Sequence, residues 1–311
     1  MHILVTGASG FIGRNLVPNL LNSGHAVSAL MRQSTQVMPD HPDLSIIQAD
    51  LNQPTATLKS AVCNSDAIIH LAGDSTPRSS AGSLLIDAQT SLIPTLNLLE
   101  IVKSSKTLKC FVYASSGGTV YGRPINTPIS ESHPTNPTSP YGIGKLMCEH
   151  MVRLAAEEAG IQHIIMRISN PYGPHQHGRR KQGVIGAWIK AALANQSIEI
   201  WGDGSTVRDY LYVEDVVKAM CLTVENCPPS GIYNLGSGLG YSLKEITAIL
   251  QDNLGRKLNI VHKPMFSYDV NVNILSVQKL TSVIPWSAHT PLNEGIARTI
   301  HWMSTNNIAA D

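Results

Sequence analysis

The chain has 311 residues, 43% of them apolar, so it is long enough to bury a large core in one domain or two. Its 23 Lys and Arg residues nearly balance 22 Asp and Glu residues, and the formal charge of +1 excludes a global attraction to nucleic acid or an anionic membrane. No stretch reaches the roughly 18 apolar residues of a transmembrane helix. Five scattered cysteines without a C-x-x-C pair argue against a disulfide framework, so we expect a cytoplasmic protein with no membrane or nucleic-acid partner.

The first half of the chain alternates short apolar runs with helical patterns. Strands are predicted at residues 2–6, 26–31, 44–49, 67–72, 110–115 and 163–168. Helices are predicted from Phe11 up to Gly24, over about 83–104, and from Pro140 to about Gly160, the last with Met147, Met151 and Leu154 on one face. Ser139 suits the N-cap of that last helix. This β-α-β order predicts an α/β fold with a Rossmann-type doubly wound parallel sheet.

After residue 169 the predicted elements become shorter and the loops richer in Pro, Gly and His. No low-complexity linker marks a boundary, so we expect the two halves of the chain to pack closely. We predict a Rossmann domain over residues 1–169 and a smaller C-terminal lobe over residues 170–311, interleaved with it, that completes a cleft.

A glycine-rich turn joins the first predicted strand to the first helix. The sequence GASGFIG contains Gly7, Gly10 and Gly13, with Phe11 and Ile12 between them. Glycine permits the tight turn and close backbone approach that a pyrophosphate needs, and the following helix N-terminus offers free N–H groups. Because strand, turn and helix stand in the required order, these residues predict a binding site for NAD or NADP.

The end of the second predicted strand bears on which dinucleotide binds. An acidic side chain there bonds the ribose 2′-hydroxyl of NAD, whereas an arginine suits the 2′-phosphate of NADP. This place has Arg32 and no Asp or Glu, which favours NADP, although Arg32 could also be solvated or stack on the adenine of NAD. Asp50 and Leu51 follow the third strand, where Asp50 could bond the adenine amino group or cap a helix.

The sequence SPYGIGK places Tyr141 four residues before Lys145 on a predicted helix. Residues four apart share a helix face, so the ammonium can lie beside the phenol. The positive charges of Lys145 and of an oxidised nicotinamide favour the phenolate form. A phenolate can take a proton from a sugar hydroxyl as hydride leaves its carbon, which makes the pair a candidate catalytic acid/base. Lys145 can also hold the nicotinamide ribose.

Motifs along nearly the whole chain resemble the extended short-chain dehydrogenase/reductase family, in its branch of nucleotide-sugar epimerases and dehydratases. The motifs are GASGFIG, DL (50–51), IIHLAG (68–73), SSGGTVYG (115–122), SPYGIGK, RISNPYGP (167–174), WGDGSTVRDYLYVEDV (201–216) and YNLGSG (233–238). The resemblance implies a sheet that binds NAD(P), a smaller lobe that binds a nucleoside-diphosphate sugar, and usually a homodimer. It also implies that Tyr141 is the acid/base and Lys145 its partner.

The resemblance assigns binding roles to further residues. Those that would line the cofactor are Leu71, Ala72 and Gly73. Asn170 would contact the sugar or the phosphates. Arg208 would clamp the diphosphate, for which a guanidinium has suitable bidentate geometry, unless it forms a surface ion pair with Asp209 or Asp215.

Two positions depart from the family pattern. The family's third catalytic group is usually a Ser or Thr four residues before the tyrosine of VYG, but Gly117 stands there. We expect Thr119 or Ser116 to supply the hydrogen bond to the substrate instead. The second departure is Phe266, where related enzymes often have an arginine that binds the diphosphate. The basic residues that would then assist Arg208 are Arg179, Arg180 and Lys181.

The same segment bears on the type of reaction. Sugar dehydratases of this family place Asp and Glu beside the catalytic hydroxyl, where this chain has Gly118 and Thr119, so elimination of water is not expected. We predict a nucleotide-sugar epimerase that oxidises a sugar carbon and reduces it again from the other face. The alternatives are an NADPH-dependent reductase of 4-keto-6-deoxyhexoses, which Arg32 favours, and a non-catalytic dinucleotide sensor, which the Tyr–Lys pair disfavours.

Two groups of histidines have ordinary interpretations. His175 and His177 form an H-x-H pattern without a carboxylate or cysteine nearby in sequence, so no metal site is expected. His70 lies inside an apolar strand and is interpreted as a core histidine with satisfied ring nitrogens.

Overall fold

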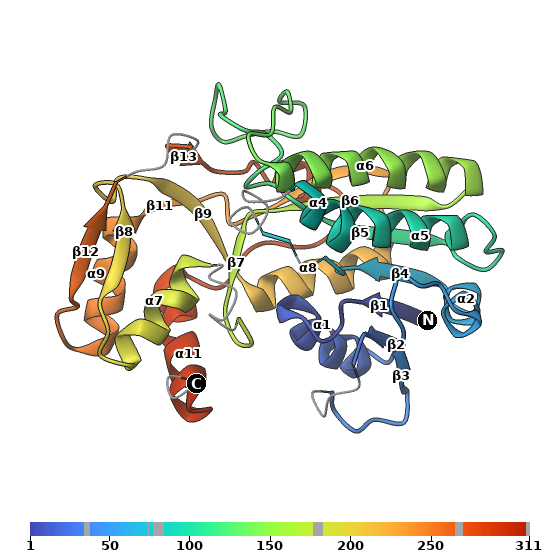
Figure 1. Cartoon of the computed structure of the whole chain (residues 1–311), viewed down its shortest axis with the longest axis horizontal. Coiled ribbons are helices and arrows are strands. Elements are labelled where there is room, and N and C mark those ends of the chain that lie inside the picture. The colour runs from blue at the N-terminus through green and yellow to red at the C-terminus, as the bar shows by residue number, and fades with distance from the viewer. Residues whose placement is uncertain (34–37, 74, 77–83, 177–182, 265–269, 309–311) are drawn as a thin grey trace.

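The computed structural model describes residues 1–33, 38–73, 75–76, 84–176, 183–264 and 270–308. It has two lobes, a larger one built on a seven-stranded sheet and a smaller one with two shorter sheets (Figure 1). The predicted α/β class with a Rossmann-type sheet is confirmed.

The seven-stranded sheet is parallel and has the strand order β10-β6-β5-β4-β1-β2-β3. Its strands are β1 (His2–Thr6), β2 (Ala26–Met31), β3 (Leu44–Gln48), β4 (Ala67–His70), β5 (Cys110–Ser116), β6 (Gln162–Ile168) and β10 (Gly231–Leu235). The order reverses between β1 and β4, and ligands of such sheets bind outside the carboxyl ends of the strands at this point. The second half of the chain supplies β10, which the sequence patterns did not predict.

Helices cover both faces of this sheet (Figure 1). One face packs against α1 (Phe11–Asn22) and α8 (Val213–Asn226), and the other against α2 (Ala56–Cys63), α5 (Ile93–Val102) and α6 (Pro140–Ala159). Successive strand residues point to opposite faces, so Tyr113 of β5 faces α6 while Val112 faces α8. Both faces are buried, which explains why the strands read as continuous apolar runs.

The helix predicted over 83–104 is interrupted. The chain forms α4 (Leu84–Asp87), then a π-helical turn η1 (Ala88–Leu92), and only then α5. Pro94 accounts for the break, because proline lacks an N–H and its ring clashes with the carbonyl four residues earlier in a regular helix. A widened turn before it relieves that clash.

Helix α6 begins and ends where the sequence predicted. The Ser139 hydroxyl caps it by accepting the N–H of Gly142 at 3.2 Å, and Gly160 ends it in the left-handed region. Of the predicted apolar face, Met151 packs against the core, whereas Met147 and Leu154 are 40% and 50% exposed. The face that packs on the sheet carries Cys148, Val152, Ala155 and Ala156.

The smaller lobe packs three helices around its own core. Its helices are α7 (Val184–Leu193), α9 (Leu243–Leu254) and α11 (Leu292–Thr305), with the short α10 (Gln278–Thr281) packed at the larger lobe. Its strands are β7 (Asn170–Tyr172), β8 (Ile198–Trp201), β9 (Val207–Tyr212), β11 (Gly240–Ser242), β12 (Ile260–Lys263) and β13 (Val272–Asn273). Strand β9 pairs with β7, β11 and β13 and runs directly into α8, so the two lobes share a continuous element.

Candidate cofactor and catalytic site

The turn between β1 and α1 holds three backbone segments in contact. Gly7 has φ 68°, and a Cβ there would lie 2.8 Å from the Ala72 nitrogen and 2.9 Å from the Leu71 carbonyl carbon. A Cβ at Gly13 would overlap the Ala8 carbonyl oxygen. No side chain caps α1, since its N-cap is Gly10, so the positive end of the helix is open to an anion. This cradle fits the pyrophosphate of a dinucleotide, with Phe11 and Ile12 in the first helical turn.

The other sequence-predicted contacts to the nucleotide lie at the ends of the neighbouring strands. Arg32 follows β2 and is exposed. The Asp50 carboxylate accepts the N–H of Asn52 at 2.9 Å, which closes a local turn, whereas the cap of α2 is Thr55. Leu51 is buried behind this turn. All three residues are therefore at the same sheet edge as the glycine turn.

His70, the last residue of β4, is fully buried and precedes Leu71, Ala72 and Gly73, the segment that is predicted to line the cofactor. Its Nδ1 lies 2.6 Å from Thr6 Oγ1, and its Nε2 lies 2.9 Å from Thr95 Oγ1. Thr95 donates its hydroxyl to the Ser91 carbonyl, so it accepts from His70, and the proton is on Nε2. Thr6 accepts the N–H of Ala72 and donates to Nδ1. The imidazole is neutral and satisfied, which confirms the interpretation of a core histidine.

We expect His70 to make the folded protein less stable at acidic pH. Burial, with a smaller contribution from Lys145, lowers the pKa of His70 from 6.5 to about 3. The unfolded chain therefore binds a proton between these pH values that the folded chain does not, so the free energy of unfolding falls as the pH drops below about 6.5. The wild-type protein should lose about 2 kcal/mol more than His70→Gln between pH 6.5 and pH 5, measured by denaturant unfolding. Parallel pH curves for the two proteins would contradict the assignment.

Helix α6 presents Tyr141 and Lys145 at the carboxyl end of β5. Lys145 Nζ donates to the Ala114 carbonyl at 2.8 Å and lies 5.0 Å from the ring centroid of Tyr113 and 5.9 Å from that of Tyr141. A Cβ at Gly73 would lie 3.9 Å from Lys145 Nζ. The cofactor-lining segment after β4 therefore faces the lysine, and the glycine turn, this segment and the Tyr–Lys pair form one continuous site.

The structure gives a physical reason for Gly117. A Cβ at this residue would lie 2.5 Å from Leu275 Cδ1 and 3.0 Å from the Arg167 carbonyl oxygen. Leu275 is itself fully buried and its N–H is bonded to the Asp209 carboxylate. The place that a serine side chain would need is thus filled by a residue from the second half of the chain. Gly118 has more room, since a Cβ there would have the Asn170 side-chain carbonyl oxygen as its nearest neighbour, at 3.9 Å.

The two hydroxyl candidates differ in their surroundings. Thr119 Oγ1 is buried and has no hydrogen-bond partner among the described residues. The Thr119 carbonyl oxygen would lie 2.9 Å from a Cβ at Gly142, so the Thr119 backbone packs against the first turn of α6, beside Tyr141. Ser116 is half-buried at the end of β5, and the strand alternation places it on the face opposite Tyr113 and α6. The Thr119 backbone therefore lies next to the helix turn that carries Tyr141, whereas the Ser116 side chain is on the other face of β5.

Residues 3–236 match the NAD-dependent epimerase/dehydratase family. The chain belongs to this family. A putative UDP-glucose 4-epimerase of Methanocaldococcus jannaschii is 34% identical over 308 residues, covering 98% of this chain and 99% of the relative. The dTDP-4-dehydro-6-deoxyglucose reductase of Escherichia coli is 30% identical, covering 96% of each chain. The UDP-glucose 4-epimerase of Thermus thermophilus, solved with NAD, superposes with a TM-score of 0.89 at 28% identity, covering 98% of this chain and 99% of that one.

In this member of the epimerase/dehydratase family the predicted substrate residues lie where the two lobes meet. Asn170 opens β7, and its amide donates to the Asp209 carbonyl at 2.9 Å. Arg208 lies next to Asp209 on β9, and among the described residues no ion pair joins it to Asp209 or Asp215. Asp209 instead holds the loop around Ser237 through its carboxylate, whose pKa is raised by burial. The other predicted phosphate ligands are Arg179, Arg180 and Lys181. These three residues and Phe266 lie outside the described residues.

Sequence reasoning missed a polar cluster beside Lys145. The Ser75 hydroxyl donates to the Asp87 carboxylate at 2.5 Å and lies 2.8 Å from the Ser91 hydroxyl. Burial raises the pKa of Asp87, and its carboxylate lies so close to α6 that only glycine fits at residue 144. Ser91 Oγ would be 3.3 Å from a Cβ at Gly73. These residues sit around the π-helical turn, and no motif or spacing marks them in the sequence.

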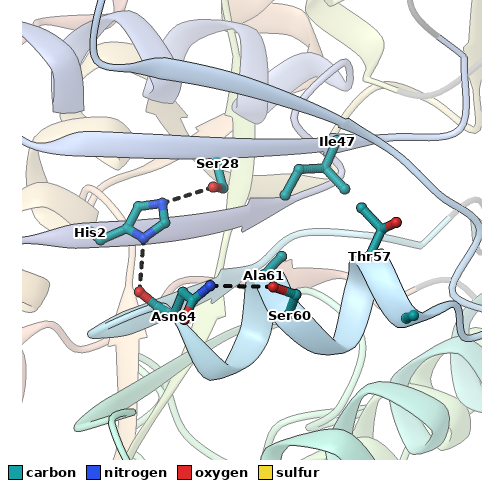
Figure 2. Close-up of a pocket in the computed structure, with 8 residues that line it drawn as sticks. His2, Ser28, Ile47, Thr57, Ser60, Ala61 and Asn64 are labelled. Atoms are coloured by element: carbon teal, nitrogen blue, oxygen red, sulfur yellow. Dashed lines mark hydrogen bonds between the residues drawn. The ribbon is translucent and has the colours of Figure 1, made fainter.

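A separate cavity of about 500 Å³ lies between the sheet and α2, at the amino end of β1 (Figure 2). His2 bonds Ser28 Oγ and the Asn64 carbonyl across it, both at 2.8 Å, so its polar groups are already paired. The cavity is on the opposite side of the strands from the family's cofactor site and has no part in it. In the described part of the chain, no three His, Cys, Asp or Glu side chains gather as a metal-binding group. Nor does any helix there have the length and apolarity to cross a membrane.

Proposed function

We propose that this protein is a nucleotide-sugar 4-epimerase that acts on a nucleoside-diphosphate hexose such as UDP-glucose. The observation that carries the proposal is the position of the Tyr141–Lys145 pair, at the end of β5 and facing Gly73 of the cofactor-lining segment. The UDP-glucose 4-epimerases among the relatives support the substrate class.

In this proposal Tyr141 is the acid/base. It removes the proton of the sugar hydroxyl as the carbon is oxidised. It returns the proton after the keto-sugar has rotated in the pocket and is reduced again. Lys145, held by the Ala114 carbonyl, keeps its charge beside the phenol and can bond the nicotinamide ribose. Bound NAD would supply the hydride acceptor and donor for the sugar carbon, and return of the hydride to the opposite face would invert that carbon.

The third catalytic group in the proposal is Thr119, whose buried hydroxyl has no partner among the described residues and whose backbone carbonyl packs against the first turn of α6. Ser116 is the weaker candidate because it points to the other face of β5. Gly118 and Thr119 provide no carboxyl acid or base, so the proposal excludes dehydration of the sugar. Asn170 and Arg208 are proposed to bind the sugar and the diphosphate.

The cofactor is proposed to be NAD, as the family name and the Thermus relative's bound NAD support. Gly7, Gly10 and Gly13 would hold its pyrophosphate through backbone N–H groups. Arg32 still favours a 2′-phosphate, and with the dTDP-keto-sugar reductase among the relatives it supports a second candidate, an NADPH-dependent keto-sugar reductase.

One experiment tests both candidates. The protein is purified without added nucleotide, its retained dinucleotide is identified by mass spectrometry, and it is then assayed with a panel of nucleotide sugars. An epimerase keeps its cofactor bound and interconverts two sugars without net consumption of NAD. A reductase consumes added NADPH in equal amounts with a keto-sugar. No bound or binding dinucleotide and no turnover of any sugar would reject both.

Exposed apolar side chains on neighbouring helices support the homodimer that we also propose. Helices α4, α5 and α6 lie side by side on one face of the larger lobe (Figure 1). Their exposed large apolar residues are Leu85, Ile86, Ile93, Ile143, Met147 and Leu154. Exposed large apolar side chains gathered on adjacent helices are usual at subunit interfaces and costly in contact with water.

We expect Ile143→Glu to convert the dimer into a monomer, because a charge in the core of an apolar interface must be desolvated. Light scattering measures the change in mass. Val261→Glu is the matched control, since Val261 is an exposed apolar residue of β12 in the smaller lobe. Equal masses for wild type and Ile143→Glu would place the interface elsewhere.

A further inference from the structure

A buried ion pair lies one helical turn beyond Lys145 on α6. Arg167 of β6 and Glu149 of α6 are 3% and 2% exposed. Arg167 donates from Nη2 to Glu149 Oε2 at 2.7 Å and from Nε to Oε1 at 3.0 Å, a bidentate arrangement. Ser115 Oγ of β5 donates to Glu149 Oε1 at 2.5 Å. The carboxylate therefore joins α6 to the carboxyl ends of two adjacent strands.

The position of this carboxylate relates it to the site. Tyr141, Lys145 and Glu149 follow each other at intervals of four residues, so they share one face of α6. Ser115 and Arg167 are register partners in the parallel pair β5 and β6, and both point to that face. Ser115 is also the residue before the segment that carries the candidate hydroxyls. A shift of Glu149 would displace Tyr141 and this segment relative to each other.

Arg167 also connects the ion pair, through Tyr121, to Asn234 of β10. Its guanidinium carbon lies 4.7 Å from the ring centroid of Tyr121, whose hydroxyl donates to Asn234 Oδ1 of β10 at 2.7 Å. The Asn234 amide in turn donates to the Ile129 carbonyl at 2.8 Å. Arg167 thus packs the turn after the candidate hydroxyls from below, and its Nη1 has no partner among the described residues.

We propose that Glu149 is a positioning residue: paired with Arg167, it fixes the end of β5 against the Tyr141–Lys145 face of α6 while adding no net charge to that face. The proposal rests on the proposed function, because it concerns the acid/base Tyr141. A simple apolar contact would hold the elements together equally well, and buried ion pairs are seldom the more stable choice. The ion pair instead supplies a directed hydrogen bond from Ser115 to Glu149. Because Arg167 cancels the charge of Glu149, no net charge is added one helical turn from Lys145.

The charge balance makes the proposal testable, because each charge of the pair acts on Tyr141 when its partner is removed. The other titratable groups that face the Tyr–Lys pair are Tyr113 of β5, His70 of β4, Asp87 of α4 and Cys148 of α6. Those that face the ion pair are Tyr113 and Tyr121, and Glu131 in turn acts on Tyr121. None of these changes in the variants below.

Glu149→Gln keeps an acceptor for Ser115 but leaves the arginine unpaired, and a guanidinium cannot lose its proton. Its charge favours the phenolate over roughly 12 Å, the rise of two helical turns, so the acidic midpoint of kcat against pH should fall by about one unit. The neutral double variant Glu149→Gln/Arg167→Met should return the midpoint to the wild-type value. Ser115→Ala, which removes the bond and no charge, should lower kcat several-fold with KM and the midpoint unchanged.

If the ion pair had only a structural role, its removal would change the stability of the protein but not the pH midpoint of kcat. An unchanged or raised midpoint in Glu149→Gln, or a double variant that fails to restore it, overturns the proposal. Glu149→Gln could fail to fold. In that case, a wild-type kcat in both the double variant and Ser115→Ala also overturns the proposal. If the wild-type protein turns over no nucleotide sugar, the proposed function fails separately. The midpoint is then measured from the phenolate absorbance of each NAD-loaded protein, with its Tyr141→Phe counterpart as blank. An unchanged or raised midpoint in Glu149→Gln again overturns the positioning proposal.

Discussion

The Tyr141→Phe variant is expected to lose a factor of about 10²–10⁴ in kcat while it still folds and still retains its dinucleotide. The phenol hydroxyl is the group at the end of β5 that can exchange a proton with a sugar hydroxyl, with Lys145 Nζ 5.9 Å from its ring centroid. Phenylalanine keeps the ring and its packing, so the loss should appear in kcat and hardly in KM. Steady-state epimerisation rates and mass spectrometry of the retained cofactor measure both parts.

Tyr233→Phe is the matched control for this change. Its hydroxyl donates to the Pro229 carbonyl at 2.6 Å on β10, at the edge of the sheet, so its removal should affect stability slightly and kcat not at all. If Tyr141→Phe keeps wild-type turnover, another group transfers the proton and the assigned acid/base is wrong. If Tyr141→Phe loses its cofactor as well, the role of Tyr141 is in binding.

Local patterns were sufficient to predict the large sheet except for β10, and to predict the glycine turn. Strands β1 and β2 have the predicted bounds because fully buried parallel strands are continuous apolar runs. Helix α6 begins at Pro140, after its N-cap Ser139, because cap chemistry is local. The pattern did not show how that face is used: Met151 packs against the core, whereas Met147 and Leu154 are exposed. Periodicity shows that a helix has an apolar face, but cannot distinguish the core from a subunit interface.

The details of the catalytic site depend on contacts between distant residues, and these have no local signal. Leu275, from the second half of the chain, fills the space beside Gly117. Asp87 and Ser91 come beside Lys145 and Gly73 through the π-helical turn that precedes Pro94. The motif comparison could therefore identify the missing hydroxyl, but not the reason for its absence or its replacement.

Thr119→Val is expected to lower kcat by about 10²-fold, the usual cost of removing one hydrogen-bond donor to the reacting oxygen. The same variant should be more stable than wild type by roughly 1 kcal/mol, because valine has the shape of threonine and removes a buried hydroxyl without a partner among the described residues. Opposite changes in activity and stability indicate a group retained for function. Ser116→Ala, which changes the other face of β5, should leave kcat within a few-fold.

Restoring the usual family residue should not rescue this variant. In Thr119→Val/Gly117→Ser the new side chain meets Leu275 Cδ1 at 2.5 Å and the Arg167 carbonyl at 3.0 Å, so the double variant should be about 1–3 kcal/mol less stable and no faster. Shortening Leu275 to alanine in that background relieves the first contact, and any recovery of kcat should appear only then. A larger loss of kcat in Ser116→Ala than in Thr119→Val would transfer the role to Ser116. Rescue by Gly117→Ser alone would show that the segment moves away from Leu275 when substrate binds.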